Sequence, residues 1–500
     1  MTAIAEVPWI VWVIALPLAA ATAVFVSRRH TARVGVLASC AITGAVAGLT
    51  WRVWQFGPQR YHVGGWGAPL GIDLYADGLS LSMLLMTAVV GVSVGVYATG
   101  YFADGGDAHD GGADTAHPAD FWALWLFLWA ALNALFLSGD VFNLYVTLEL
   151  ITLSAVGLVT LARTTTAVAA AWRYLVAALF GSLFYLLGVA LLYATYGVLD
   201  VATLGRTTMP GTLTSVAVAS MAVGLALKAA LFPLHFWLPP AHGSAPAPVS
   251  AVLSALVVKA SFYLLLRLWF DAFPSVVPAA AGTVLAVLGA AAIAWGSMHA
   301  MLAPGLKALV AYSTVAQLGY LFLVFLLAIP GEGSPAWAGS VLFALSHACA
   351  KASMFLAAGS ILRVAGHDRI ADLGGVGRRL PMTFFTMAVA SVTLMGLPPS
   401  GAFVAKWMLL QAALDDGHLW LAGIILAGGL LAAGYLFRIL GQAFTPSGTD
   451  STLAVPGSME WAALGLAAIA VALGLFTAPA LDLLQVGAPV AGTAVPDVTP

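Results

Sequence analysis

The feature that most constrains this chain is a run of about 20 apolar residues that recurs along its whole length. A helix of that length crosses a hydrocarbon core about 30 Å thick. Charged residues make up 8% of the chain, against about 25% in soluble proteins. The sequence predicts an all-α, polytopic membrane protein with about fourteen transmembrane helices. The runs are 8–27, 34–54, 79–101, 121–138, 140–162, 170–196, 212–235, 246–270, 275–300, 305–329, 336–363, 381–414, 418–442 and 460–480.

Composition also excludes several kinds of protein. The net charge is −2 and no basic run is longer than the pair Arg28 and Arg29, so no nucleic-acid partner is expected. The two cysteines, Cys40 and Cys349, are too few for an iron-sulfur cluster, a Cys-only zinc site or a disulfide framework. We find no nucleotide-binding glycine loop and no pair of histidines that stands out as haem ligands. We therefore expect no cofactor, no metal and no catalytic or redox centre in this chain.

The arginines predict the orientation in the membrane. The first apolar run begins after Glu6 without a basic segment before it, so we interpret it as a retained helix and not as a cleaved signal. With the N-terminus outside, the inner loops contain ten arginines and the outer loops four. The positive-inside rule then places both termini outside, in the cell's inner (plasma) membrane. The inner set is Arg28, Arg29, Arg33, Arg163, Arg173, Arg363, Arg369, Arg378, Arg379 and Arg438, and the outer set is Arg52, Arg60, Arg206 and Arg267.

One inner loop, 102–120, does not follow this pattern, because it contains five aspartates and no Lys or Arg. Acidic residues count little in the rule, so the orientation stands. His109 and His117 in this loop could bind a metal, but a solvated polar loop is the better interpretation.

The lysines are distributed differently from the arginines. The chain has five, and all lie inside or at the edge of an apolar run: Lys228, Lys259, Lys307, Lys351 and Lys406. Arginine stays protonated in proteins, whereas burial lowers the pKa of lysine and so can remove its charge. Glu149 is the one acid deep in an apolar run. Ionisable groups in lipid cost about 2.5 to 3.5 kcal/mol each and usually mark ion paths. This pattern favours proton transport.

Each of these groups also has a simpler interpretation. Lys307 follows Pro304 and Gly305 closely, and we expect it to extend to the lipid headgroups. Glu149 and Lys228 could form a static ion pair between two helices. His347 and Lys351 are four residues apart on one helix face, where a proton relay is favoured over a histidine that only fills the core.

Two of the apolar runs contain helix-breaking residues. Run 212–235 includes Pro233 after Lys228, and run 381–414 includes the sequence 396–401, with two prolines and two glycines, before Lys406. Broken helices are tolerated in a bilayer where protein or a water-filled cavity lies beside them. The broken runs are the seventh and the twelfth and so lie five runs apart, which suggests two related halves. We divide the chain into 1–120 (helices 1–3), 121–270 (first repeat), 275–442 (second repeat) and 443–500 (helix 14 and tail).

Six stretches between residues 70 and 445 together resemble a known family: 142–149, 227–240, 245–250, 311–319, 346–352 and 396–399. They look like the antiporter-like, proton-pumping subunits shared by respiratory complex I, membrane-bound hydrogenases and Mrp-type cation/proton antiporters. The resemblance implies fourteen helices, ten of which form two inverted five-helix repeats, with helices 7 and 12 broken. It also implies membrane partner subunits, and protons with a possible role for Na⁺ as transported ions.

The same resemblance implies a role for each candidate site residue. Glu149 resembles the family's carboxylate on the fifth helix and Lys228 its partner on the broken seventh. Lys259 resembles the central lysine of the eighth helix, and Lys406 the terminal lysine of the broken twelfth. His347 and Lys351 resemble the bridging pair of the eleventh. Together they imply a proton relay, coupled either to cation antiport or to electron transfer.

Within the family, the chain length and Lys406 look most like the Mrp D subunit or a hydrogenase-associated homologue. The sequence departs from many relatives at Pro240 to His242 and just before Lys307, where those relatives have acidic residues. Two alternatives stay open at this point: a free-standing secondary transporter of a small solute, and an NADH/quinone-linked complex I subunit.

Overall fold

The computed structural model is a bundle of long helices, and it describes residues 7–103, 118–328, 334–442, 445 and 454–488. The longer helices are α2 (Trp9–Ser27), α3 (Thr31–Phe56), α4 (Gly78–Tyr101), α5 (Pro118–Leu137), α6 (Val141–Thr160), α7 (Thr165–Tyr196), α9 (Thr212–Lys228), α12 (Val258–Arg267), α13 (Ala279–Leu302), α14 (Leu306–Phe322), α16 (Pro335–Ala365), α18 (Pro381–Met395), α19 (Gly401–Asp415), α20 (Leu419–Gln442) and α21 (Gly457–Leu475). Short helices are α8 (Val201–Thr207), α10 (Leu238–Ser244), α11 (Ala247–Val252), α15 (Val324–Leu327), α17 (Val376–Arg379) and α22 (Thr477–Gln485).

The expected all-α membrane fold is confirmed. Twelve helical segments of the described residues are long and apolar enough to span a membrane, and two shorter apolar helices, α9 and α18, belong to the two runs expected to be broken. The count of fourteen spans and the two repeats stay predictions. Residues 104–117, with His109 and His117 and most of the acidic loop, lie outside the described residues.

Two neighbouring runs, 121–138 and 140–162, form separate helices because Asp140 starts a new one. Its carboxylate accepts hydrogen bonds from the backbone N–H groups of Phe142 (2.9 Å) and Asn143 (2.7 Å) and so caps α6. Burial raises the pKa of the Asp140 carboxyl, and the two backbone hydrogen bonds oppose that shift.

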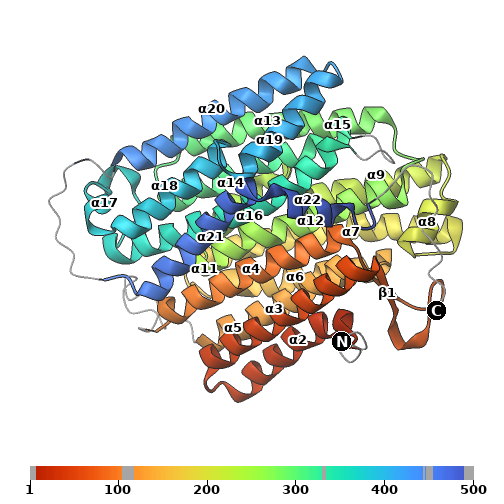
Figure 1. Ribbon diagram of the computed structural model, residues 1–500, viewed down its shortest axis with the longest axis horizontal. Coiled ribbons are helices and arrows are strands. Elements are labelled where there is room, and N and C mark those ends of the chain that lie inside the picture. The colour runs from red at the N-terminus through yellow and green to blue at the C-terminus, as the bar shows by residue number, and fades with distance from the viewer. Residues whose placement is uncertain (1–6, 104–117, 329–333, 443–444, 446–453, 489–500) are drawn as a thin grey trace.

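The helices divide into a buried centre and a lipid-facing periphery. The apolar middle parts of Ala247–Ala272 and of α16 are completely buried, and that of Leu306–Leu327 is almost completely buried. Helices α2 and α3 lie at one side of the bundle and α20 at the other, with α16 between them (Figure 1). Most of the surface of these outer helices is exposed, as expected for helices in contact with lipid. The central helices are the ones that contain Lys259, His347 and Lys351.

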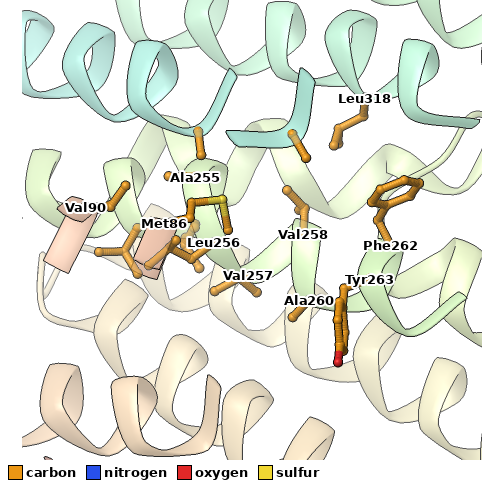
Figure 2. Close-up of a cluster of buried hydrophobic side chains, with 14 of the residues drawn as sticks. Met86, Val90, Ala255, Leu256, Val257, Val258, Ala260, Phe262, Tyr263 and Leu318 are labelled. Atoms are coloured by element: carbon orange, nitrogen blue, oxygen red, sulfur yellow. The ribbon is translucent and has the colours of Figure 1, made fainter. Parts of the chain in front are cut away.

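The packing around the centre is apolar. Val258 and Ala260, the chain neighbours of Lys259, belong to a cluster of buried hydrophobic side chains with Met86, Phe262 and Leu318 (Figure 2). An ionised group in such surroundings has little solvation. The position of Lys259 is therefore expensive for a charge.

One end of the bundle has an additional hairpin that the sequence did not predict. Strand β1 (Gln59–His62) pairs antiparallel with β2 (Asp73–Ala76), and α8 lies at the same end (Figure 1). The expectation that Arg267 lies in an outer loop is wrong. Arg267 belongs to the helical segment Ala247–Ala272, and its side chain is buried. It forms ion pairs with Asp77 and, at 2.9 Å, with Asp271. Asp77 also caps α4, so this ion pair joins the start of α4 to the end of the central helix.

We expect Arg267→Leu to lower the free energy of unfolding by about 3 to 5 kcal/mol, because Asp77 would stay buried without its counter-charge. Loss of the exposed pair Arg369–Asp372 through Arg369→Leu should cost less than about 1 kcal/mol. Thermal unfolding of the purified protein in detergent measures both changes. Equal midpoints for the two variants would contradict the structural role of Arg267.

Candidate functional site

The first break in the bundle places Lys228 at the end of a half-helix. Helix α9 ends at Lys228, Ala230 adopts a left-handed φ of 55°, and the chain continues through Pro233 into a 3₁₀ turn, η2 (Leu234–Trp237), and α10. Proline has no backbone N–H to continue the helix. The indole N–H of Trp237 donates to the carbonyl of Leu227 at 3.0 Å, and the N–H of Ala230 donates to the same carbonyl at 3.1 Å.

Lys228 forms an ion pair with the predicted partner. Its Nζ lies 3.3 Å from Oε1 of Glu149 and donates to Oγ1 of Thr152 at 2.9 Å, one turn further along α6. The hydroxyl of Ser182 on α7 also donates to Glu149. The Lys228 side chain is 5% exposed and that of Glu149 is 19% exposed. The pair is therefore shielded on the lysine side and partly open on the carboxylate side.

Two glycines allow the close helix crossing beside this pair. A Cβ on Gly224 of α9 would lie 2.3 Å from the carbonyl oxygen of Gly181 on α7, and one on Gly181 would lie 2.8 Å from that of Gly224. Small residues at such crossings let helix backbones approach closely in membranes. The crossing brings Ser182 of α7 beside the charged pair.

Lys259 lies next to an irregular turn of the central helix. Residues Leu253–Val257 form a π-helical turn, η3, directly before α12, and Lys259 is completely buried. Its Nζ donates to the carbonyl of Ser254 within that turn. The hydroxyl of Ser254 in turn shares a 2.9 Å hydrogen bond with Thr314 of α14. π-turns are common at functional sites because they leave backbone groups available to side chains.

His347 and Lys351 lie one turn apart on α16, as predicted, and both are buried. The His347 ring stacks on Phe343 at 5.7 Å, and neither ring nitrogen has a hydrogen-bond partner among the described residues. Lys351 donates to the carbonyl of Val310 at 2.9 Å and to the hydroxyl of Ser313.

His347 is close to three of the predicted lysines. It interacts electrostatically with Lys259, Lys351 and Lys406. Lys351 also interacts with Lys259. The histidine thus lies between groups that come from three different helices.

The second break holds Lys406. Helix α18 ends at Met395, Gly396 has φ 80°, and Ser400 caps α19, its hydroxyl accepting from the N–H of Phe403 at 3.2 Å. Nζ of Lys406 donates to the last carbonyls of α18, those of Leu394 (3.2 Å) and Met395 (3.4 Å).

The Lys406 ammonium also lies over an aromatic ring. Nζ is 4.3 Å from the ring centroid of Tyr320 and 5.6 Å from that of Phe343. A cation here is favoured both by the ring faces and by the negative end of the α18 dipole.

The six predicted residues therefore form two groups. Glu149 and Lys228 are in direct contact, and Lys259, His347, Lys351 and Lys406 interact around the histidine. Within the described residues, no hydrogen bond or ion pair joins Lys228 to Lys259.

A further histidine lies near the central lysines. His242 on α10 is completely buried, its ring stacks on Phe355 at 4.9 Å, and it interacts electrostatically with Lys259, Lys307 and Lys351. The expectation that Lys307 extends to the headgroups is wrong, because this side chain is buried and donates to the carbonyl of Ala245.

Sequence reasoning missed the neutral members of the site. Thr152 is three residues after Glu149 and thus on its helix face, a signal that could have been used. Ser182 and Tyr320 come from other helices, and nothing in their local sequence marks them as partners of Glu149 and Lys406.

The chain was compared with known protein families. Residues 138–432, more than half of the chain, match the family described as "NADH:quinone oxidoreductase/Mrp antiporter, TM". The chain belongs to this family. Residues 66–109 also match "NADH-Ubiquinone oxidoreductase (complex I), chain 5 N-terminus". The resemblance inferred from the motifs is confirmed at the level of the family.

Members of the NADH:quinone oxidoreductase/Mrp antiporter family similar to this chain include the NADH-quinone oxidoreductase subunit N of Desulforudis audaxviator, 34% identical over 89% of both chains. Among solved structures, a chain of the archaeal membrane-bound sulfane sulfur reductase superposes with a TM-score of 0.86 at 27% identity, over 95% of this chain and 96% of that one. A chain of the Mrp complex from Dietzia sp. DQ12-45-1b gives 0.85 at 25% identity, over 97% and 96%. The narrower expectation, an Mrp D subunit or a hydrogenase-associated homologue, stays a prediction.

We expect Gly396→Ala to destabilise the protein by about 1 to 3 kcal/mol, because alanine is strained at the left-handed φ of this position. Its Cβ would also lie 2.7 Å from Cδ of Lys406. Gly423→Ala on α20, where a Cβ meets nothing within 4 Å, is the matched control and should be neutral. Thermal unfolding in detergent compares the two variants. An unchanged unfolding midpoint for Gly396→Ala would contradict the structural role of this turn.

Proposed function

We propose that this chain is a proton-translocating membrane subunit of a multisubunit complex. The observation that supports this best is the position of His347, a buried histidine without hydrogen-bond partners among the described residues, between three buried lysines. Ionisable groups inside an apolar bundle carry an energetic cost, and they usually mark an ion or proton pathway. A relay from Glu149 and Lys228 through Lys259, His347 and Lys351 to Lys406 uses all of them.

The ion pair at the first break is the control point of this relay. At 3.3 Å, the attraction between Lys228 and Glu149 is about 5 kcal/mol for an effective dielectric constant of about 20. Moving one charge against 100 mV costs about 2.3 kcal/mol. Withdrawing the Glu149 charge therefore changes the energy of a proton on Lys228 by enough to drive it towards Lys259. Water would bridge the distance between these two lysines.

Supporting evidence for partners comes from the similar proteins, since the sulfane sulfur reductase and the Mrp structure are multisubunit membrane complexes. The names of the relatives include both oxidoreductases and Na⁺/H⁺ antiporters. Electron transfer and a cation gradient are therefore both candidate energy sources for this chain. Genes adjacent to this one would decide between them: iron-sulfur or nickel-binding subunits indicate redox coupling, and several small antiporter subunits indicate Mrp.

The proposal includes the arrangement of the chain. Residues 121–270 and 275–442 are two inverted repeats, each with one broken helix, between helices 1–3 at 1–120 and a last helix with its tail at 443–500. Both termini lie outside the cell's inner membrane. The interruptions after Lys228 and before Lys406 support the two halves, since each half contains one.

We expect Lys259→Ala and Glu149→Ala each to abolish coupled proton flux in membrane vesicles while the assembled complex remains detectable. Lys259→Ala removes a group through which every proton must pass. Glu149→Ala removes the charge that controls proton transfer from Lys228. Ser261→Ala, a buried position on the same helix as Lys259, is the control and should retain flux. Normal flux in both relay variants would disprove the relay.

Lys259→Arg separates proton transfer from charge alone. Arginine keeps a positive charge at this site but does not release its proton in proteins. We therefore expect this variant to assemble and to transport no more protons than Lys259→Ala. Retention of wild-type flux in vesicles would mean that Lys259 acts only through its charge.

A further inference from the structure

One face of α14 lies between Lys351 and Lys406. Ser313, Gln317 and Tyr320 have helical spacings of four and three residues, so they share this face. All three are buried, with exposures of 0%, 1% and 0%. Lys351 donates to the hydroxyl of Ser313 at one end of the stripe, and Lys406 lies over the ring of Tyr320 at the other.

A tyrosine from α20 joins the members of this stripe. Nε2 of Gln317 donates to the hydroxyl oxygen of Tyr435 at 3.2 Å, and Ser313 is a second side-chain hydrogen-bond partner of that hydroxyl. The Ser313 hydroxyl itself donates to the carbonyl of Val310 at 2.8 Å. A hydroxyl proton can rotate about the C–O bond, so Ser313 can turn its proton from Val310 to the Tyr435 oxygen while its Oγ accepts from Lys351.

One hydrogen-bond acceptor in this stripe is the buried amide oxygen of Gln317, Oε1, which has no hydrogen-bond partner among the described residues. Buried amide oxygens are nearly always paired, directly or through water. The hydroxyl of Tyr320 cannot fill this role, since it donates to the carbonyl of Ile425 at 3.3 Å. Gln317 Oε1 is therefore suited to hold a water molecule.

We propose that the Tyr435 hydroxyl is the connecting group for proton transfer between Lys351 and Lys406, with Ser313 before it and a water held by Gln317 after it. The proposal rests on the proposed function. Lys351 gives a proton to Ser313, Ser313 releases its own to Tyr435, and Tyr435 releases its own to the water. The water passes a proton to the neutral amine of Lys406. Each hydroxyl gains one proton and loses one, so one charge moves and every intermediate group is restored.

The test compares two tyrosines that lose only a hydroxyl. Tyr435→Phe removes the connecting group, whereas Tyr97→Phe on α4 removes the hydroxyl of another buried tyrosine, which donates to the backbone carbonyl of Leu356 at 2.9 Å. Coupled proton flux per assembled complex is measured in H₂O and in D₂O. We expect Tyr435→Phe to lower this flux about a hundredfold or more, the lower end of the contribution of a positioned proton-transfer group, and to increase the solvent isotope effect. Tyr97→Phe should keep the flux within about twofold of the wild type.

A purely structural role for Tyr435, as a hydrogen bond between α14 and α20, predicts less assembled complex but normal flux per complex and an unchanged isotope effect. That result overturns the proposal. If Tyr435→Phe does not assemble, Ser313→Ala is tested by the same measurements. Full proton flux per complex in Ser313→Ala would also contradict the proposed transfer through Tyr435. Lys259→Ala is measured in parallel. Full proton flux in Lys259→Ala disproves the whole relay. If Lys259→Ala is inactive and Tyr435→Phe has normal flux, only the transfer through Tyr435 is disproved.

Discussion

The structure depends on one constraint: backbone groups freed inside a membrane must be satisfied by the protein or by water. At both helix interruptions, the freed backbone groups lie beside a lysine. Lys406 binds the terminal carbonyls of α18, and Lys228 is the last residue of α9, where Trp237 binds the carbonyl of Leu227. The ends of α9 and α18 have partial negative charge, which stabilises a cation. Each break therefore creates a place where a lysine can hold a proton in an apolar bundle.

Between the two breaks, the most deeply buried helices bring together groups that can change charge. The chain neighbours of Lys259, Val258 and Ala260, belong to an apolar cluster, and its ammonium donates to one carbonyl of a π-turn. His347 interacts with lysines from three helices and has no hydrogen-bond partner of its own in the described part of the chain. The same low dielectric that makes each charge costly makes its interaction with its neighbours strong, so small changes at one site affect the next.

The sequence was sufficient to predict what depends on local composition. Apolar runs predict helices, and a lysine within such a run is visible without a partner, so the apolar helices, the breaks and six candidate site residues could be named. What depends on distant contacts could not. Arg267 was placed in a loop because its partner Asp77 is 190 positions away. Lys307 was expected at the headgroups because the Ala245 carbonyl that it binds is distant in the sequence, in the link between α10 and α11. Neutral partners such as Ser182 and Tyr435 have no charge to distinguish them from ordinary packing residues.

The central claim is that buried lysines change protonation as the complex works. This chain has only five lysines, and all are buried. Infrared difference spectra of the complex, reconstituted with ¹⁵N-lysine in this chain alone, measure that change directly. The account predicts isotope-sensitive ammonium bands that appear or disappear when turnover begins. Lysine bands that stay constant during full proton transport would contradict it.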